Sequence, residues 1–306
     1  MLYDVVIIGG GPAGLTAGLY SARARLETIL VEKALYGGQV MTTERIENYP
    51  GFDEGISGPE LAMRMERHAK RFGLEVVKGT VIGVSFNDKI KEVRLEDGGI
   101  YKGKTVIIST GARPRSLNID GEERLRGRGV SYCATCDGAF FSGERVAVVG
   151  GGDSAVEEGI FLTRFADEVY IIHRRDELRA TKVLQERASS NPKIRFILDT
   201  LVERIEGEDS VKALHLRNVK SNERSILDVR GVFIYIGYRP NTDIFKGIVN
   251  LDEDGYIITD EDMATSVSGV FAAGDVRAKS LKQIATAIGD GAIAAVSAER
   301  YIEENF

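Results

Sequence analysis

The two cysteines of the chain, Cys133 and Cys136, are separated by two residues in the segment Cys-Ala-Thr-Cys. A pair at this spacing can be a redox dithiol, half of a zinc site or a structural disulfide. Zinc would need further ligands, but the only histidines are scattered at positions 68, 173 and 215. A structural disulfide around so small a loop would constrain the unfolded chain very little. The spacing therefore favours a redox dithiol.

Asp137 follows the second cysteine directly. Its carboxyl group could exchange a proton with a cysteine thiolate when the disulfide opens. A lone Asp before Gly138 could equally be a turn residue, so both interpretations stay open.

The elements that would position this chemistry are predicted from an internal repeat. Residues 5–32 align without gaps on residues 146–173. In each copy, an apolar β-branched run is followed by a glycine turn, an Ala-rich helix and a second apolar run, which together form a βαβ unit. The sequence therefore predicts an α/β fold with two nucleotide-binding, Rossmann-like domains, each doubly wound in three layers.

Each copy carries the glycine fingerprint of dinucleotide-binding sites between its first strand and its helix. Glycine permits the tight turn and lets a pyrophosphate approach the N–H groups of the helix N-terminus. The first copy has the pattern G-x-G-x-x-G, and the second has the permitted variant G-x-G-x-x-A. The candidate residues are Gly9, Gly11, Pro12, Ala13 and Gly14 in the first copy, and Gly150, Gly152, Asp153, Ser154 and Ala155 in the second.

The two copies differ where the second strand ends. The first has Glu32, whose carboxylate would accept hydrogen bonds from ribose hydroxyls and repel a 2′-phosphate. The second has His173, which alone reads as structural, followed by Arg174, Arg175 and Arg179. Guanidinium groups bind a 2′-phosphate in bidentate fashion, so the second site should take NADPH. The alternatives are a solvated acid at the first site and a solvated basic helix start at the second.

The domain boundaries are predicted from the turns that end each nucleotide-binding unit. The first domain should run to the turn after the strand at 105–108, and the final stretch of the chain, which has no glycine fingerprint, is assigned back to it. We therefore expect a first domain of residues 1–113 and 245–306 and an inserted second domain of residues 117–242, which carries both cysteines. Two parallel connections between domains make a hinge.

Length, charge and hydropathy exclude several classes of protein. The length of 306 residues suits two domains, and a net charge of -6 argues against a general nucleic-acid binder. No apolar run is long enough to span a bilayer, and a strand that begins at Tyr3 leaves no room for a signal peptide. Two cysteines exclude the disulfide framework of small secreted proteins. A cytoplasmic protein without membrane or nucleic-acid partners is expected.

In this order, these motifs resemble the low-molecular-weight, NADPH-dependent thioredoxin reductases of bacteria and archaea over essentially the whole chain. No single segment is specific to this family, but the order in which the segments occur along the chain is. The resemblance rests on the segments GGGPAG at 9–14, GGQ at 37–39, IENYPGF at 46–52, TGA at 110–112, CATCDG at 133–138, GGGDSA at 150–155, HRRDELRA at 173–180, GD at 274–275 and QIATA at 283–287.

The resemblance implies FAD in the first domain and NADPH in the second, without a metal. Cys136 would be the sulfur nearer the flavin, and Asp137 would be the acid. Lys282 stands where relatives often have Arg. Beyond the first glycine turn and Glu32, the residues implied for FAD are Gly38, Gln39, Asn48, Thr110, Gly111, Asp275, Gln283, Ile284 and Ala285.

The activity implied is hydride transfer from NADPH to FAD, reduction of the Cys133–Cys136 disulfide, and thiol–disulfide exchange with thioredoxin. Domain rotation would alternate the half-reactions, and the resemblance also implies a homodimer. One alternative is a flavin-dependent NADPH reductase of another redox partner, either peroxidase-linked or glutaredoxin-like. A non-catalytic sensor of NADP(H) is another, but the dithiol argues against it.

Overall fold

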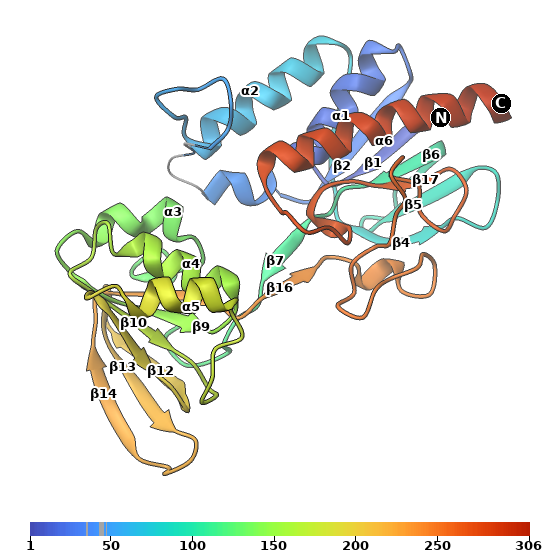
Figure 1. The fold of residues 1–306 in the computed structure, drawn as a ribbon. Coiled ribbons are helices and arrows are strands. Elements are labelled where there is room, and N and C mark those ends of the chain that lie inside the picture. Colours follow the sequence, from blue (N-terminus) through green and yellow to red (C-terminus); the bar gives the residue numbers. More distant parts are fainter. Residues whose placement is uncertain (35, 43–45, 47) are drawn as a thin grey trace. The chain divides into compact units, whose positions relative to one another are not determined.

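The computed structural model describes residues 1–34, 36–42, 46 and 48–306, without the side chains of Thr42 and Cys136. The chain forms two compact units. The first unit comprises Met1–Arg113 and Arg239–Phe306, and the second comprises Pro114–Tyr238 (Figure 1). The two segments that join them pair as short strands, β7 (Ala112–Pro114) and β16 (Tyr238–Pro240).

The first unit is built on a sheet with a parallel core. Its strands follow the order β3-β2-β1-β6, continued by the antiparallel strands β5 (Lys91–Leu95) and β4 (Val81–Ser85), and β17 pairs with the second half of β6. The strands are β1 (Leu2–Ile8), β2 (Thr28–Glu32), β3 (Glu75–Lys78), β6 (Ile100–Ile108) and β17 (Val270–Ala272). The carboxyl ends of β1 and β6 lie side by side, because Ile8 is in register with Ile108.

Both faces of this sheet are covered. Side chains alternate along a strand, so Val5 and Ile7 of β1 pack against the helices while Val6 and Ile8 pack against the opposite layer. This explains the continuous apolar run that begins at Val5. The helices are α1 (Pro12–Arg23), α2 (Gly58–Arg71) and α6 (Ile284–Asn305), and the opposite layer contains the antiparallel strands β4 (Val81–Ser85) and β5 (Lys91–Leu95) with the chain from Phe245 to Val276.

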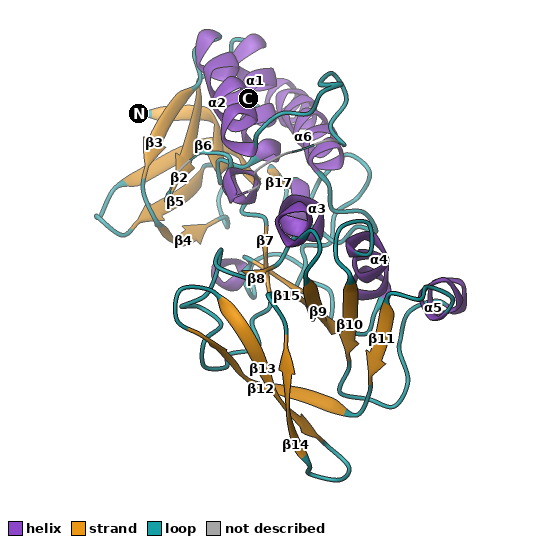
Figure 2. Cartoon of the chain, turned by 90° about the vertical axis from the view of Figure 1, so that its left-hand side faces the viewer, coloured by secondary structure: helices purple, strands orange, loops and turns teal. Residues whose placement is uncertain are grey.

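The second unit repeats this plan. Its parallel sheet has the order β11-β10-β9-β15-β8. Helices cover one face, and a three-stranded antiparallel sheet covers the other (Figure 2). The parallel strands are β8 (Val130–Ser131), β9 (Arg145–Gly150), β10 (Glu168–Ile172), β11 (Ile194–Ile197) and β15 (Gly231–Tyr235); the helices are α3 (Ala134–Asp137), α4 (Asp153–Leu162) and α5 (Lys182–Ser189); the antiparallel strands are β12 (Thr200–Gly207), β13 (Val211–Asn218) and β14 (Arg224–Asp228).

The predicted α/β fold with two Rossmann-like halves is confirmed, because β1-α1-β2 and β9-α4-β10 are the two copies of the repeat. In each unit one face is covered by helices and the other by β-structure, a detail that the repeat alone did not predict. Short 3₁₀ helices η1 (Gly38–Thr42), η2 (Gly138–Phe141), η3 (Asp243–Phe245) and η4 (Gly274–Val276) complete the elements. No helix in the described part of the chain has the length and apolar character that crossing a membrane requires.

Helix α4 carries an acid into the apolar layer of the second unit. Glu158 lies between Val156 and Gly159, which are buried in that layer. Its Oε2 atom is buried and accepts no hydrogen bond from the described residues. Burial, followed by repulsion from Glu157, raises the pKa of Glu158 to about 7.

We expect Glu158→Gln to stabilise the protein at alkaline pH but not at acid pH. The pKa of this carboxyl group is about 7 in the folded protein and 4.5 in the unfolded chain. Its burial therefore does not lower the free energy of unfolding below pH 4.5, and lowers it fully above about pH 7. The gain above neutrality should be about 1–2 kcal/mol, discounted because the side chain is partly exposed. The measurement is the melting temperature of the FAD-saturated protein at pH 5 and pH 8. The exposed neighbour, in Glu157→Gln, is the control, and an equal effect of Glu158→Gln at both pH values would contradict the account.

Candidate functional site

The first glycine turn is closely packed on its inner side and open on its outer side. Gly9 has φ +107°, and a Cβ there would collide with the carbonyl oxygen of Ser109 at the end of β6. A Cβ on Gly14 would collide with the carbonyl oxygen of Gly9, so α1 crosses β1 too closely for a side chain. A Cβ on Gly11 would meet nothing within 4 Å. The open side faces the start of α1, where first-turn N–H groups have no acceptor within the helix.

The second glycine turn has the same geometry. A Cβ on Gly150 would collide with the carbonyl oxygen of Tyr235 at the end of β15. Ala155, which stands where the first copy has Gly14, is buried. A Cβ on Gly152 would meet nothing within 4 Å, and Asp153 and Ser154 are exposed at the start of α4. Both predicted fingerprints therefore form turns that leave room for a ligand.

Glu32 and His173 lie against the middle glycine of their turns, in equivalent places. Glu32 Oε2 accepts a hydrogen bond from Gly10 N at 2.7 Å, and its Oε1 accepts one from Ala34 N at 2.9 Å. The carboxylate retains lone pairs for further donors. The ring of His173 fills the space next to Gly151, where a Cβ would be 2.5 Å from its Nδ1.

Arg174, Arg175 and Arg179 form an exposed cluster of positive charge in the second unit. The described residues offer no hydrogen bond or ion pair to their guanidinium groups. Burial lowers the pKa of the neighbouring His173 imidazole, and the charges of the three arginines lower it further. A neutral histidine surrounded by unpaired cations is suited to an anionic ligand.

Two further segments of the first unit converge on the open side of its glycine turn. A Cβ on Gly38 would lie 3.4 Å from the Cα of Gly11, so η1 begins directly beside the turn. A Cβ on Gly274 would lie 2.8 Å from the Cβ of Ala13, which places η4 against the start of α1. The predicted segments GGQ and GD, far apart in sequence, are thus brought together.

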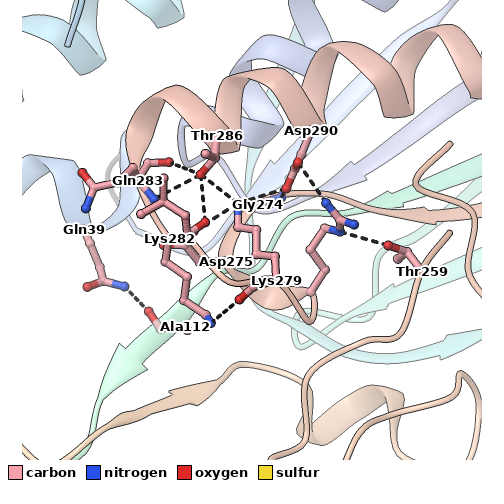
Figure 3. A network of polar contacts seen from close by, with 12 residues as sticks. Gln39, Ala112, Thr259, Gly274, Asp275, Lys279, Lys282, Gln283, Thr286 and Asp290 are labelled. Atoms are coloured by element: carbon pink, nitrogen blue, oxygen red, sulfur yellow. Dashed lines mark hydrogen bonds and ion pairs between the residues drawn. The ribbon is translucent and has the colours of Figure 1, made fainter. Parts of the chain in front are cut away.

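Side-chain hydrogen bonds join the other predicted residues of this region. Asn48 Nδ2 donates to Gln283 Oε1 at 3.0 Å. Gln283 is the N-cap of α6, directly ahead of Ile284 and Ala285. Gln39 Nε2 donates to a backbone carbonyl of β7 (Figure 3).

Thr110 and Gly111 lie at the carboxyl end of β6, where the chain leaves the first unit. Thr110 Oγ1 donates to Asn241 O at 2.8 Å, and Asn241 Nδ2 donates back to Thr110 O at 2.8 Å. These bonds fasten the outgoing and returning segments to each other. Glu47, which belongs to the segment at 46–52, lies outside the described residues.

Asp275 presents a buried carboxyl oxygen without a hydrogen bond. Its Oδ1 has no donor among the described residues, and Lys279 Nζ is 3.5 Å away (Figure 3). Burial raises the pKa of Asp275, although the charge of Lys279 lowers it. A buried carboxyl oxygen without a hydrogen bond can accept one from a hydroxyl group of a ligand.

Asp290 holds the segment that carries Asp275, and the sequence did not identify it. Its carboxylate accepts hydrogen bonds at 3.0 Å from Gly274 N, from Arg277 Nη1 and from Lys279 Nζ (Figure 3). The available signal was that Asp290 is the only charged residue of α6 before its last turns. Such an acid in an apolar helix needs partners.

The dithiol segment lies at the start of α3. Cys133 is disulfide-bonded, and Cys136, the only other cysteine, has its side chain outside the described part. Ser131 Oγ donates to Asp137 Oδ2 at 2.6 Å and accepts from Cys133 N at 3.0 Å. Ser131, which the sequence did not identify, therefore fixes Asp137 next to the first cysteine.

Tyr235 supports the same helix from β15. Ala134 N donates to Tyr235 Oη at 2.6 Å. Burial, and then the charge of Glu158, raises the pKa of Tyr235 well above its ordinary value, so the phenol stays protonated. No sequence motif indicated this contact, since the two residues are far apart in the chain.

Comparisons with known proteins identify the family of the chain. The profile of the family described as pyridine nucleotide-disulphide oxidoreductase matches residues 3–291. The chain is 49% identical to the thioredoxin reductase of Peptoclostridium acidaminophilum, with 100% of this chain and 98% of that protein covered. It is 50% identical to the thioredoxin reductase of Bacillus subtilis, with 99% and 96% covered.

Solved structures give the same result. The crystal structure of thioredoxin reductase from Streptococcus pyogenes superimposes with a TM-score of 0.84 at 50% identity, covering 99% of both chains. That of T. acidophilum thioredoxin reductase has a TM-score of 0.75 at 34% identity, again over 99% of both chains. The chain therefore belongs to the thioredoxin reductases, within the pyridine nucleotide-disulphide oxidoreductase family.

Proposed function

We propose that the chain reduces thioredoxin with electrons from NADPH, and that each unit holds one of its two nucleotides. The observation that carries the proposal is the pair of equivalent glycine turns, both open, of which one is bonded to an acid and the other to a segment with three exposed arginines. Membership of the family implies FAD and NADPH. Reduction of another redox partner is not favoured, because the full-length relatives are named thioredoxin reductases.

The first unit fits FAD. The space over Gly11 admits a pyrophosphate, and Glu32 keeps lone pairs for ribose hydroxyls. The buried oxygen of Asp275 would accept a hydroxyl of the chain that links the pyrophosphate to the flavin. The proposed contacts from η1, from the end of β6 and from the α6 N-terminus are Gly38, Gln39, Asn48, Thr110, Gly111, Gln283, Ile284 and Ala285.

The second unit fits NADPH. The space over Gly152 admits its pyrophosphate at the start of α4. The 2′-phosphate would be bound by Arg174, Arg175 and Arg179, which have no competing partner in the described chain. Glu32 at the equivalent place of the first unit would repel such a phosphate.

Bound FAD supplies the chemistry that takes a hydride from NADPH and delivers an electron pair to the disulfide. The chain's own residues carry out the thiol–disulfide exchange and the proton transfer. Reduction breaks the Cys133–Cys136 bond, and Asp137, oriented by Ser131, would give a proton to the thiolate nearer the flavin, which we assign to Cys136. One thiolate of the pair then attacks the disulfide of thioredoxin, and the second resolves the mixed disulfide, which restores the Cys133–Cys136 bond and releases reduced thioredoxin.

The nucleotide and the dithiol belong to the same unit, so we propose that they reach the flavin alternately by rotation about the two connecting segments, β7 and β16. We further propose that the protein works as a homodimer in the cytoplasm. The homodimer rests on the resemblance alone. The cytoplasmic location rests on the dithiol, because a reducing compartment would keep such a pair redox-active.

Cys133→Ser and Cys136→Ser should each abolish thioredoxin reduction while NADPH still bleaches the flavin absorption. The reason is that hydride transfer precedes the dithiol in the proposed sequence. The measurement combines stopped-flow absorption with a thioredoxin-dependent turnover assay, and Ser142→Ala, at an exposed position after the same segment, is the control. Thioredoxin reduction that survives in either serine variant would show that the dithiol is not the exit for electrons.

Arg174→Ala/Arg175→Ala should raise KM for NADPH by roughly a hundredfold or more, since each charge-assisted contact contributes on the order of 1.5–3 kcal/mol. KM for NADH should hardly change, because NADH lacks the 2′-phosphate. The loss should leave kcat nearly unchanged, since the phosphate is bound equally in ground and transition states. The measurement is the steady-state KM and kcat with NADPH and with NADH, at one fixed salt concentration because salt screens these charges.

The matched control is Arg187→Ala, which removes an exposed arginine of α5 in the same unit. It should leave both KM values unchanged. An equal loss with NADPH and NADH in the double variant would mean that Arg174 and Arg175 are structural, and would remove the physical support for NADPH in the second unit.

A further inference from the structure

The segment that carries the arginines, residues 174–181, is attached to the second glycine turn by three successive backbone N–H groups. Arg179 N and Ala180 N donate to Gly151 O at 2.6 and 3.0 Å. Thr181 N donates to Asp153 Oδ1 at 2.7 Å. The last of these bonds is made by a side chain, so a substitution can remove it without changing the backbone.

Asp153 is an unexpected residue for its place. It is the first residue of α4, where the proposed pyrophosphate would bind to the helix N-terminus. A carboxylate there stabilises the helix through its dipole but repels an anionic ligand. Its hydrogen bond to Thr181 N gives the carboxylate a different role, because it joins the glycine turn to a segment that follows β10.

The other end of the arginine segment is attached independently. Asp199 N donates to Arg175 O at 3.0 Å, and Thr200 N donates to His173 O at 2.9 Å. The segment is thus held at its beginning by the turn ahead of β12 and at its end by the glycine turn. Loss of the Asp153 bond would leave the end next to Arg179 attached only by the two bonds to Gly151 O, while the beginning of the segment would keep both of its bonds.

We propose that Asp153 is a positioning residue that determines cofactor specificity: by fastening Thr181 to the glycine turn, its carboxylate holds Arg179 where the 2′-phosphate of the nucleotide arrives. The inference rests on the proposed NADPH site in the second unit. Asp153 acts through Arg179 and makes no contact with the phosphate, so its removal should affect only nucleotides that carry the 2′-phosphate.

The test is isothermal titration of the oxidised, FAD-saturated protein with NADP⁺ and with NAD⁺. Asp153→Ala removes the acceptor, and its Kd for NADP⁺ should rise about five- to tenfold, the loss expected for one hydrogen bond. Its Kd for NAD⁺ should change less than about twofold. Asp153→Asn keeps an acceptor oxygen and removes the charge, so its Kd for NADP⁺ should stay close to that of the wild-type protein.

A double-mutant cycle separates positioning from direct contact. When Asp153→Ala is added to Arg179→Ala, it should weaken NADP⁺ binding less than about twofold, since the group it positions is already absent. A full effect in that background would overturn the proposal. Tighter binding of both nucleotides by Asp153→Ala would also overturn it, because it would show that the carboxylate acts on the pyrophosphate.

The same titration separates this inference from the function on which it rests. If the wild-type protein binds NADP⁺ no more tightly than NAD⁺, the proposed NADPH site is wrong. If the wild-type protein prefers NADP⁺ and Asp153→Ala keeps the full preference, only the role of Asp153 is wrong.

Discussion

The close crossing of strand and helix at each glycine turn is the constraint on which the rest of the structure depends. At Gly9 and Gly150 the turn is pressed against the carbonyl of the neighbouring strand so tightly that a single methyl group would collide. This contact fixes the direction in which α1 and α4 leave the sheet. At Gly11 and Gly152 the same turn is open, so the start of each helix faces free space. Close packing on one side thus leaves space on the other, at the helix N-terminus where the proposed pyrophosphate would bind.

The two turns differ in charge through the residues at the end of the second strand of each copy. Glu32 is bound to the N–H of the middle glycine, while His173 fills the equivalent place as a neutral ring. The carboxylate brings negative charge to the first turn, and the three arginines bring positive charge to the second. A duplicated unit could therefore come to serve two nucleotides by a change of charge at one strand end.

Local patterns in the sequence were sufficient for the two βαβ units and their glycine turns, because each depends on residues close together in the chain. Contacts between distant segments were not predicted. Asp290 holds η4 from α6, and Tyr235 holds α3 from β15. Neither contact has a periodicity or motif to signal it. No sequence motif singled out Glu158 in α4, which is partly buried while its neighbour Glu157 is exposed. Burial of this kind depends on which face of α4 meets the sheet.

The assignment of one nucleotide to each unit is tested most directly by hydrogen exchange with mass spectrometry. FAD added to the apoprotein should protect peptides that cover residues 9–14 and 274–285, because these segments converge in the first unit. NADP⁺ added to the FAD-saturated protein should protect peptides that cover residues 150–155 and 174–181. Protection of the first glycine turn by NADP⁺, or of the second by FAD, would contradict the account.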